Sequence, residues 1–150
     1  MDYSNLPLDW SRIVIDGDPG AGKTSLAKEI ARELGAKRVS LDDYLPGNGN
    51  AYLLQLDYER VRRDILDGGS KVVVEGICIL KVMAKIGIGY DFHIFMKRFN
   101  GFVGWELESY LNPKSSLPHS KTDKDAVLYY RECKPFDVCN LVLQRDVCDR

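Results

Sequence analysis

"GDPGAGKT", residues Gly17 to Thr24, is the most informative segment of this chain, together with the segments on either side of it. It satisfies the pattern G-x-x-x-x-G-K-[ST], in which glycines let backbone N–H groups turn inward around a phosphate chain. Before it, residues 12–16 ("RIVID") form a β-branched run that predicts a buried strand. After it, residues 23–34 place apolar side chains at helical spacing, and Gly35 follows as a helix stop. The chain therefore reads strand, phosphate loop, helix, which is the context that this motif requires.

This loop predicts a site for a nucleoside triphosphate. Lys23 is expected to reach the β- and γ-phosphates and to act in catalysis, while the Thr24 hydroxyl is expected to bind Mg²⁺. ATP and Mg²⁺ are the expected donor and cofactor, and the pattern leaves ATP and GTP undistinguished. The candidate binding residues are Gly17, Asp18, Pro19, Gly20, Ala21, Gly22, Lys23, Thr24 and Ser25. Asp16 and Asp18 would repel a triphosphate unless their side chains point away from it.

The rest of the chain continues to alternate strands with helices. Further strands are predicted at 36–41, 71–80, 90–97 and 140–146. Helices are predicted at 57–69, 81–87, 101–111 and 125–133, and the polar segment 112–124 is expected to be mobile. Because strands that alternate with helices pair in parallel and are covered on both faces, we expect a three-layer α/β/α fold.

Three carboxylates stand at predicted strand ends, where ligands gather in open parallel sheets. Asp42 and Asp43 follow the second strand, and a carboxylate there could take the proton of an attacking hydroxyl or help hold Mg²⁺. The alternative is that both only cap or turn the chain. Glu75 ends the run "VVVE", and a buried carboxylate needs a partner, which a magnesium ion could supply.

Composition limits the class of protein. At 150 residues we expect a single domain spanning 1–150. Lys and Arg number 21 against 22 Asp and Glu, so no general footprint for nucleic acid is present. No run of about 18 apolar residues predicts a membrane span, and the N-terminus resembles no targeting signal, so a cytoplasmic protein is expected. Cys78 is read as a small buried hydrophobe, and its spacing from Cys133, Cys139 and Cys148 favours neither a disulfide framework nor a zinc site.

Four segments resemble the uridine kinase and phosphoribulokinase group of small P-loop kinases: "VIDGDPGAGKTSLAKEIARELG", "VSLDDYL", "VVVEGICIL" and "YYRECKPFDVCNLVL". The resemblance implies a five-stranded parallel sheet in the order 2-3-1-4-5. It also implies Lys23 and Thr24 on phosphate and magnesium, and Glu75 at the metal. Asp42 would be the catalytic base, with Asp43 as its rival. From its place at a strand end, Asp42 is also a candidate ligand of Mg²⁺.

The chain departs from that group in the lid region, around residues 98–124. Such kinases carry an arginine-rich helix there, whose cations stabilise the transferring phosphoryl group. Here Lys97 and Arg98 are followed by an arginine-free stretch. Arg98 is the candidate phosphate clamp, with Arg131, Lys121 or Lys124 as helpers, and the alternative is that Lys97 and Arg98 form an ordinary solvated strand end.

The acceptor is the open question of the sequence. The nucleoside-binding insertion of the family is reduced to residues 46–59, and Tyr44, Tyr52 and Trp105 are read either as stacking platforms or as plain packing. We expect a phosphotransferase acting on a hydroxyl of a small molecule, with a nucleoside as the first choice. The alternatives are a kinase for a sugar, sugar acid or vitamin precursor, and a nucleotide-binding regulator with little transferase activity. A homo-oligomer is compatible with the sequence.

Overall fold

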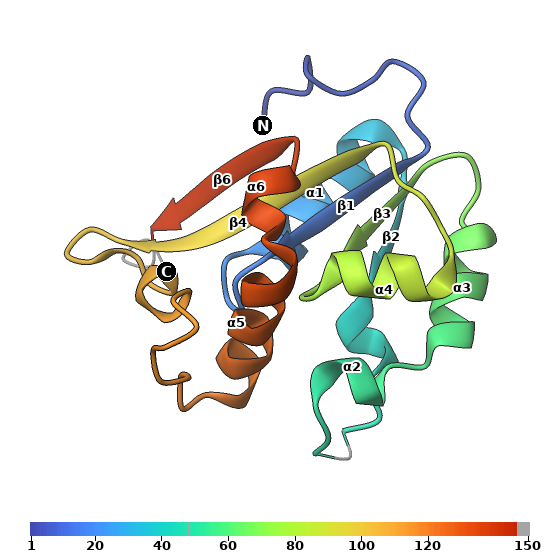
Figure 1. Cartoon of the computed structure of the whole chain (residues 1–150). Coiled ribbons are helices and arrows are strands. Elements are labelled where there is room, and N and C mark those ends of the chain that lie inside the picture. Colours follow the sequence, from blue (N-terminus) through green and yellow to red (C-terminus); the bar gives the residue numbers. More distant parts are fainter. Residues whose placement is uncertain (48, 147–150) are drawn as a thin grey trace.

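The computed structural model describes residues 1–47 and 49–146, and within them it has a sheet flanked by helices (Figure 1). The strands are β1 (Arg12–Gly17), β2 (Lys37–Ser40), β3 (Val72–Glu75), β4 (Phe92–Asn100), β5 (Gly104–Trp105) and β6 (Leu141–Asp146). The helices are α1 (Lys23–Leu34), α2 (Tyr52–Gln55), α3 (Tyr58–Leu66), α4 (Ile79–Ile86), α5 (Lys121–Cys133) and α6 (Pro135–Val138). Two short 3₁₀ helices are η1 (Leu41–Tyr44) and η2 (Glu108–Tyr110).

Five of the strands run parallel, in the spatial order β2-β3-β1-β4-β6. This confirms the order 2-3-1-4-5 when β6 is counted as the fifth parallel strand. The sheet differs from the expectation by a sixth strand, because the two-residue β5 pairs antiparallel with the end of β4. Phe99 pairs with Asp146 of β6 and also with Trp105 of β5. A strand residue can pair on two sides, and β6 occupies one side of Phe99. Strand β5 therefore lies on the other side of β4, the side that pairs with β1 at residues 92–96.

Strand alternation divides the core into two clusters on opposite faces of the sheet. Ile13, Ile15 and Ile94 pack with Ile30 and neighbouring residues of α1 on one face. Val14, Val74 and Phe95 pack on the other face with residues of α3, α4 and α5, and Figure 1 shows these three helices on the side opposite α1. The three-layer α/β/α expectation is confirmed.

Two predicted elements are wrong. The strand predicted at 71–80 ends at Glu75, because Cys78 takes a left-handed conformation (φ 59°) and α4 begins at Ile79. The helix predicted at 101–111 is a hairpin turn into β5 followed by η2, and Gly104 (φ 79°) provides a backbone conformation that few other residues adopt.

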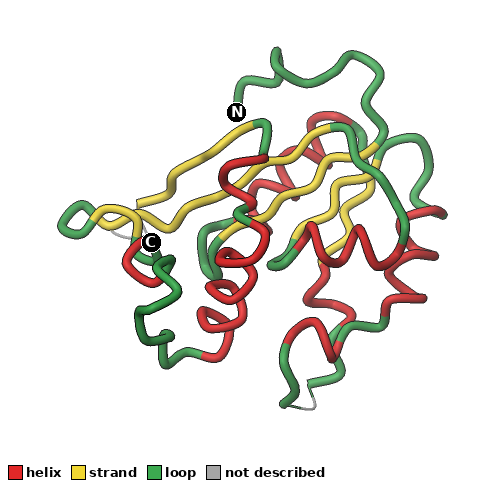
Figure 2. The backbone as a smooth tube through the Cα atoms, viewed as in Figure 1, coloured by secondary structure: helices red, strands yellow, loops and turns green. Residues whose placement is uncertain are grey.

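Between β4 and α5 the chain is mostly loop (Figure 2). This loop ends earlier than the sequence predicted. Helix α5 begins at Lys121, inside the segment that the sequence predicted as mobile. Ser120 caps it by accepting a hydrogen bond from the Asp123 N–H at 3.4 Å. The polar residues at the end of this segment are therefore the start of a helix, which the apolar pattern alone could not reveal.

The cysteines agree with the packing role that the sequence predicted for Cys78, which is 1% exposed. Cys133 and Cys139 are partly buried free thiols, and Cys148 lies outside the described residues. Across the part of the chain that the structure describes, no helix combines the length and the apolar character that crossing a bilayer requires.

Candidate active site

The phosphate loop is fixed against the central strands by its first glycine. A β-carbon at Gly17 (φ 134°) would lie 2.1 Å from the carbonyl oxygen of Met96 in β4, so only glycine fits. The next residue, Asp18, donates its backbone N–H to the same carbonyl at 2.9 Å. Gly22, in the left-handed region at φ 91°, then caps α1. The loop therefore leaves β1, presses on β4 and enters α1 as the motif requires.

Lys23 lies inside this loop, and its side chain is nearly buried. Its Nζ donates hydrogen bonds to the carbonyl oxygens of Gly17 at 3.1 Å and Asp18 at 2.6 Å. Burial lowers the pKa of the ammonium below its usual value, and the nearby carboxylates of Asp16 and Asp18 oppose that shift. The side chain also lines the pocket described below, so it can exchange a carbonyl for a phosphate oxygen.

Asp16, just before the loop, and Asp18, within it, are fully buried, and neither lines the pocket described below. Asp16 accepts hydrogen bonds from Tyr129 Oη at 2.6 Å and from the Gly17 N–H at 2.8 Å. Asp18 accepts from Tyr130 Oη, Trp105 Nε1 and the Arg98 N–H, each at 2.7 Å. The two carboxylates therefore face the interior and not the triphosphate site, and the hydrogen-bond donors stabilise their charges there. This arrangement reduces the repulsion of a triphosphate that the sequence led us to expect.

Asp18 connects the phosphate loop to the β4–β5 hairpin and to α5. Burial raises the pKa of Asp18, and the donors from Arg98, Tyr130 and Trp105 oppose the shift. We expect Asp18→Ala to lower the free energy of unfolding by about 3 kcal/mol, because buried donors lose their acceptor. Urea unfolding measures this loss. Asp67→Ala, which removes an exposed carboxylate after α3, should stay within about 0.5 kcal/mol of the wild type. An Asp18→Ala protein as stable as the wild type would contradict the expectation.

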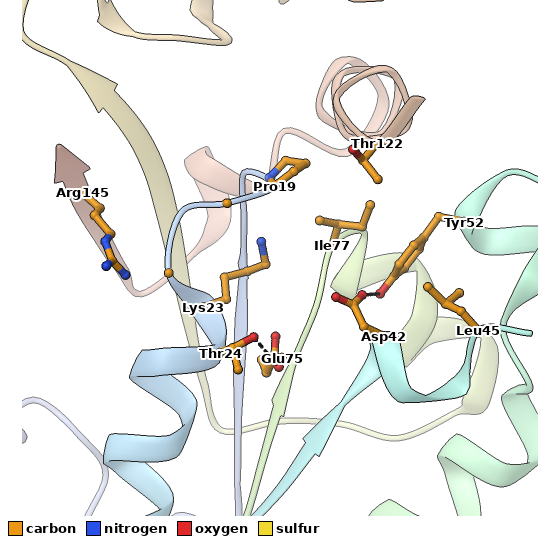
Figure 3. A pocket seen from close by; sticks show the side chains of 12 residues that line it. Pro19, Lys23, Thr24, Asp42, Leu45, Tyr52, Glu75, Ile77, Thr122 and Arg145 are labelled. Carbon is orange, nitrogen blue, oxygen red and sulfur yellow. Dashed lines mark hydrogen bonds between the residues drawn. The ribbon is translucent and has the colours of Figure 1, made fainter. Parts of the chain in front are cut away.

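A pocket of about 560 Å³ opens beside the loop (Figure 3). It is lined by Pro19, Gly20, Gly22, Lys23, Thr24, Asp42, Leu45, Tyr52, Glu75, Ile77, Thr122 and Arg145. It brings together predicted site residues from three segments: Lys23 and Thr24 after the loop glycines, Asp42 after β2, and Glu75 at the end of β3. Of the predicted donor-binding set, Gly17, Asp18, Ala21 and Ser25 are not among its lining residues, and neither is Asp43, the rival of Asp42.

Two candidate Mg²⁺-binding side chains, Thr24 and Glu75, are in contact where β3 ends next to the loop. Thr24 Oγ1 donates to Glu75 Oε1 at 3.1 Å, and Arg38 pairs with the same oxygen at 3.1 Å. Glu75 is 2% exposed, so Arg38 supplies the partner that a buried carboxylate needs. Among the described residues no group of three or more His, Cys, Asp or Glu side chains could hold a metal alone. Hydroxyl and carboxylate oxygens nevertheless suit Mg²⁺, which kinase sites hold with one or two carboxylates and substrate phosphates.

Asp42 lies at the other side of the pocket, on η1, with Tyr52 of α2 beside it (Figure 3). Tyr52 Oη donates to Asp42 Oδ1 at 3.3 Å. Burial raises the pKa of Tyr52, with the Asp42 charge adding to the effect, so the phenol stays protonated and remains a donor. This contact orients the carboxylate and engages one of its two oxygens.

Arg98, the candidate phosphate clamp, lies next to the loop but is held by the protein. Its guanidinium pairs with Glu106, contacts Asp123 Oδ2 at 3.3 Å and donates to the Pro19 carbonyl at 2.6 Å. It is not among the residues that line the pocket, and neither are the three candidate helpers. Arg131 donates to the carbonyls of Tyr110 and Ser115, and Lys121 donates to that of Gly49.

Several residues of this site escaped the sequence reasoning. Arg38 and Arg145 sit in strands whose apolar neighbours dominated the pattern, and Thr122 fell in the segment expected to be mobile. Tyr129 and Tyr130 lie in the predicted helix at 125–133, and their adjacency offered no sign that each would reach a different aspartate. Of these residues, only Arg145 had a position in the sequence that could have marked it as a ligand-binding candidate. It is a charged residue near the carboxyl end of a predicted parallel strand, where ligands bind in such sheets.

Comparison with solved structures shows which fold this is. The chain is similar to a possible uridine kinase from Bacillus stearothermophilus, with 16% identity, a TM-score of 0.61, and coverage of 93% of this chain and 91% of that one. It is similar to a gluconokinase from Sinorhizobium meliloti 1021 (16%, TM-score 0.52, 91% and 82%). It is also similar to a shikimate kinase from Aquifex aeolicus (16%, TM-score 0.51, 89% and 86%).

These solved structures are small P-loop kinases, and the likeness confirms the fold that the sequence predicted. No protein-family model matches the chain, and no curated protein matches it significantly. At this level of identity the comparisons define the architecture alone.

Proposed function

We propose that this protein is an ATP- and Mg²⁺-dependent kinase that phosphorylates a hydroxyl of a neutral small molecule, with a nucleoside as the first candidate. The observation that carries the proposal is the pocket, which places Lys23 and Thr24 of the phosphate loop opposite the carboxylate of Asp42. The kinase fold of the solved structures supports it. A loop for a donor and a base facing it across one pocket are the two parts that phosphoryl transfer needs.

In the proposed reaction the acceptor hydroxyl oxygen attacks the γ-phosphorus in line. The bond to the β–γ bridging oxygen breaks, ADP leaves with its electron pair, and Asp42 takes the hydroxyl proton on Oδ2, because Tyr52 engages Oδ1. Lys23 binds the phosphate chain. Thr24 and Glu75 would hold Mg²⁺, whose charge offsets that of the phosphates, and Asp42 is left outside this ligand set because it takes the proton. The main contribution of the protein is positioning and charge stabilisation.

The lining around Asp42 favours a neutral acceptor. Leu45, Tyr52 and Ile77 surround this end of the pocket, and the cationic side chains among the described lining residues are Lys23 and Arg145. Lys23 belongs to the donor loop, and Arg145 lies on the far side of that loop (Figure 3). A sugar acid would leave its carboxylate without a cation at this end, which is costly. Tyr52 is almost fully buried and lines this end of the pocket, so the acceptor would meet an apolar wall with the phenol oxygen directed at Asp42.

The test is ADP formation from ATP with Mg²⁺ over a panel of nucleosides, nucleotides, neutral sugars, sugar acids and vitamin precursors. We expect turnover that depends on a neutral acceptor and disappears when EDTA removes the metal. Preference for a sugar acid would contradict the proposal of a neutral acceptor, while the proposal that the protein is a kinase would stand.

A second candidate is the nucleotide-binding regulator, and the pairing of Arg98 with Glu106 and Asp123 favours it, because this arginine is not held toward the pocket. ATP binding without acceptor-dependent ADP formation over the whole panel would overturn the kinase proposal in favour of the regulator.

A further inference from the structure

Arg145 is a cationic residue of the pocket to which the sequence analysis assigned no role. It lies in β6 and is the register partner of Arg98 in β4. Its guanidinium reaches the phosphate loop, since a β-carbon at Gly22 would lie 1.9 Å from Arg145 Nη1. The glycine that the loop motif requires at this position therefore also makes room for the guanidinium. In Figure 3 Arg145 lies beside the loop, on the side away from Asp42 and Tyr52.

The charge of Arg145 has no counterpart within residues 1–47 and 49–146. Arg145 makes no hydrogen bond or ion pair there, whereas Arg98 has two carboxylates and a carbonyl. It also stands at the N-terminal end of α1, where the helix dipole is positive, and close to the loop that holds the Lys23 ammonium. Arg145 thus adds a positive charge beside two other positive features, and a bound anion would supply the partner that its guanidinium lacks among the described residues.

We propose that Arg145 binds the phosphate chain of the nucleotide donor and takes the role that the sequence assigned to Arg98; this inference rests on the proposed function. The guanidinium contacts phosphate oxygens from the side of the loop opposite Asp42, so it acts on the donor and not on the acceptor. Its planar fork suits two phosphate oxygens at once. Arg145 of β6 would thus supply the positive charge that Arg98, which is paired with Glu106 and Asp123, does not bring into the pocket.

The experiment measures binding of ATP, inorganic tripolyphosphate and adenosine to the wild type and to Arg145→Gln by calorimetry or competition. We expect Arg145→Gln to weaken ATP and tripolyphosphate about tenfold, the usual effect of losing a charge-assisted contact. Adenosine binding should not change, and Arg145→Lys should keep part of the tripolyphosphate affinity. Arg32→Gln is the matched control, because it removes an exposed arginine from the last turn of α1.

The unfolding temperature separates binding from a structural role. Because Arg145 makes no ion pair with the described residues, Arg145→Gln should unfold at the wild-type temperature, and a large decrease would overturn the assignment. Equal tripolyphosphate binding by Arg145→Gln and the wild type would also overturn it, as would a loss confined to adenosine. A wild type that binds neither ATP nor tripolyphosphate would instead refute the donor site of the proposed function.

Discussion

Asp42→Asn should reduce phosphoryl transfer by about 10²- to 10⁴-fold, the contribution that a positioned general base makes, while the affinity for ATP stays unchanged. The asparagine keeps an oxygen that can accept from Tyr52 Oη, which lies 3.3 Å from Asp42 Oδ1 in the native protein. It cannot take the proton of the acceptor hydroxyl. Steady-state rates with the best acceptor of the panel, together with a direct ATP-binding measurement, test both halves of the expectation.

Asp43→Asn is the matched control for this variant. Asp43 neighbours Asp42 on η1 and is exposed, but it does not line the pocket, so its replacement should leave the rate close to that of the wild type. Full activity of Asp42→Asn combined with an inactive Asp43→Asn would assign the base to Asp43. Full activity of both variants would remove the general base from the proposed mechanism.

Lys23→Met should lower kcat/KM by about 10³-fold, because one electrostatic contact to the transferring group is worth that much in a site shielded from water. ATP binding should weaken as well, since the same ammonium binds the phosphates in the ground state. Methionine keeps much of the buried stem and loses the charge, together with the two hydrogen bonds to Gly17 and Asp18. Kinetics and ATP titration measure the two effects separately.

Lys28→Met controls for the loss of one lysine from the same helix, because Lys28 is exposed and does not line the pocket. We expect Lys28→Met to bind ATP and turn over like the wild type. The far-ultraviolet circular dichroism of Lys23→Met should match that of the wild type, which shows that the variant is folded. ATP binding of wild-type strength by folded Lys23→Met would contradict the donor site.

Local sequence patterns predicted most of the fold. Three local signals are found as predicted: the glycine spacing of residues 17–24, the apolar period of 23–34 and the β-branched run at 12–16. Each lies within a single loop, helix or strand. The errors came where local signals were weak or mixed. The apolar run 71–80 continues past the turn after Glu75, and the segment 101–111 has apolar residues but only the short 3₁₀ helix η2.

Motif and periodicity were sufficient to predict a phosphate loop between β1 and α1, with strands and helices alternating around it. The pairing of the charges in the site could be seen only once the chain was folded. Asp18 meets Tyr130 and Asp16 meets Tyr129 across more than a hundred residues of chain, and Arg98 and Arg145 have different surroundings although they are register partners. This difference arises because motif and periodicity are properties of neighbouring residues. The partner of a buried charge depends on which distant segments the packed sheet and helices bring to within a few ångströms of it.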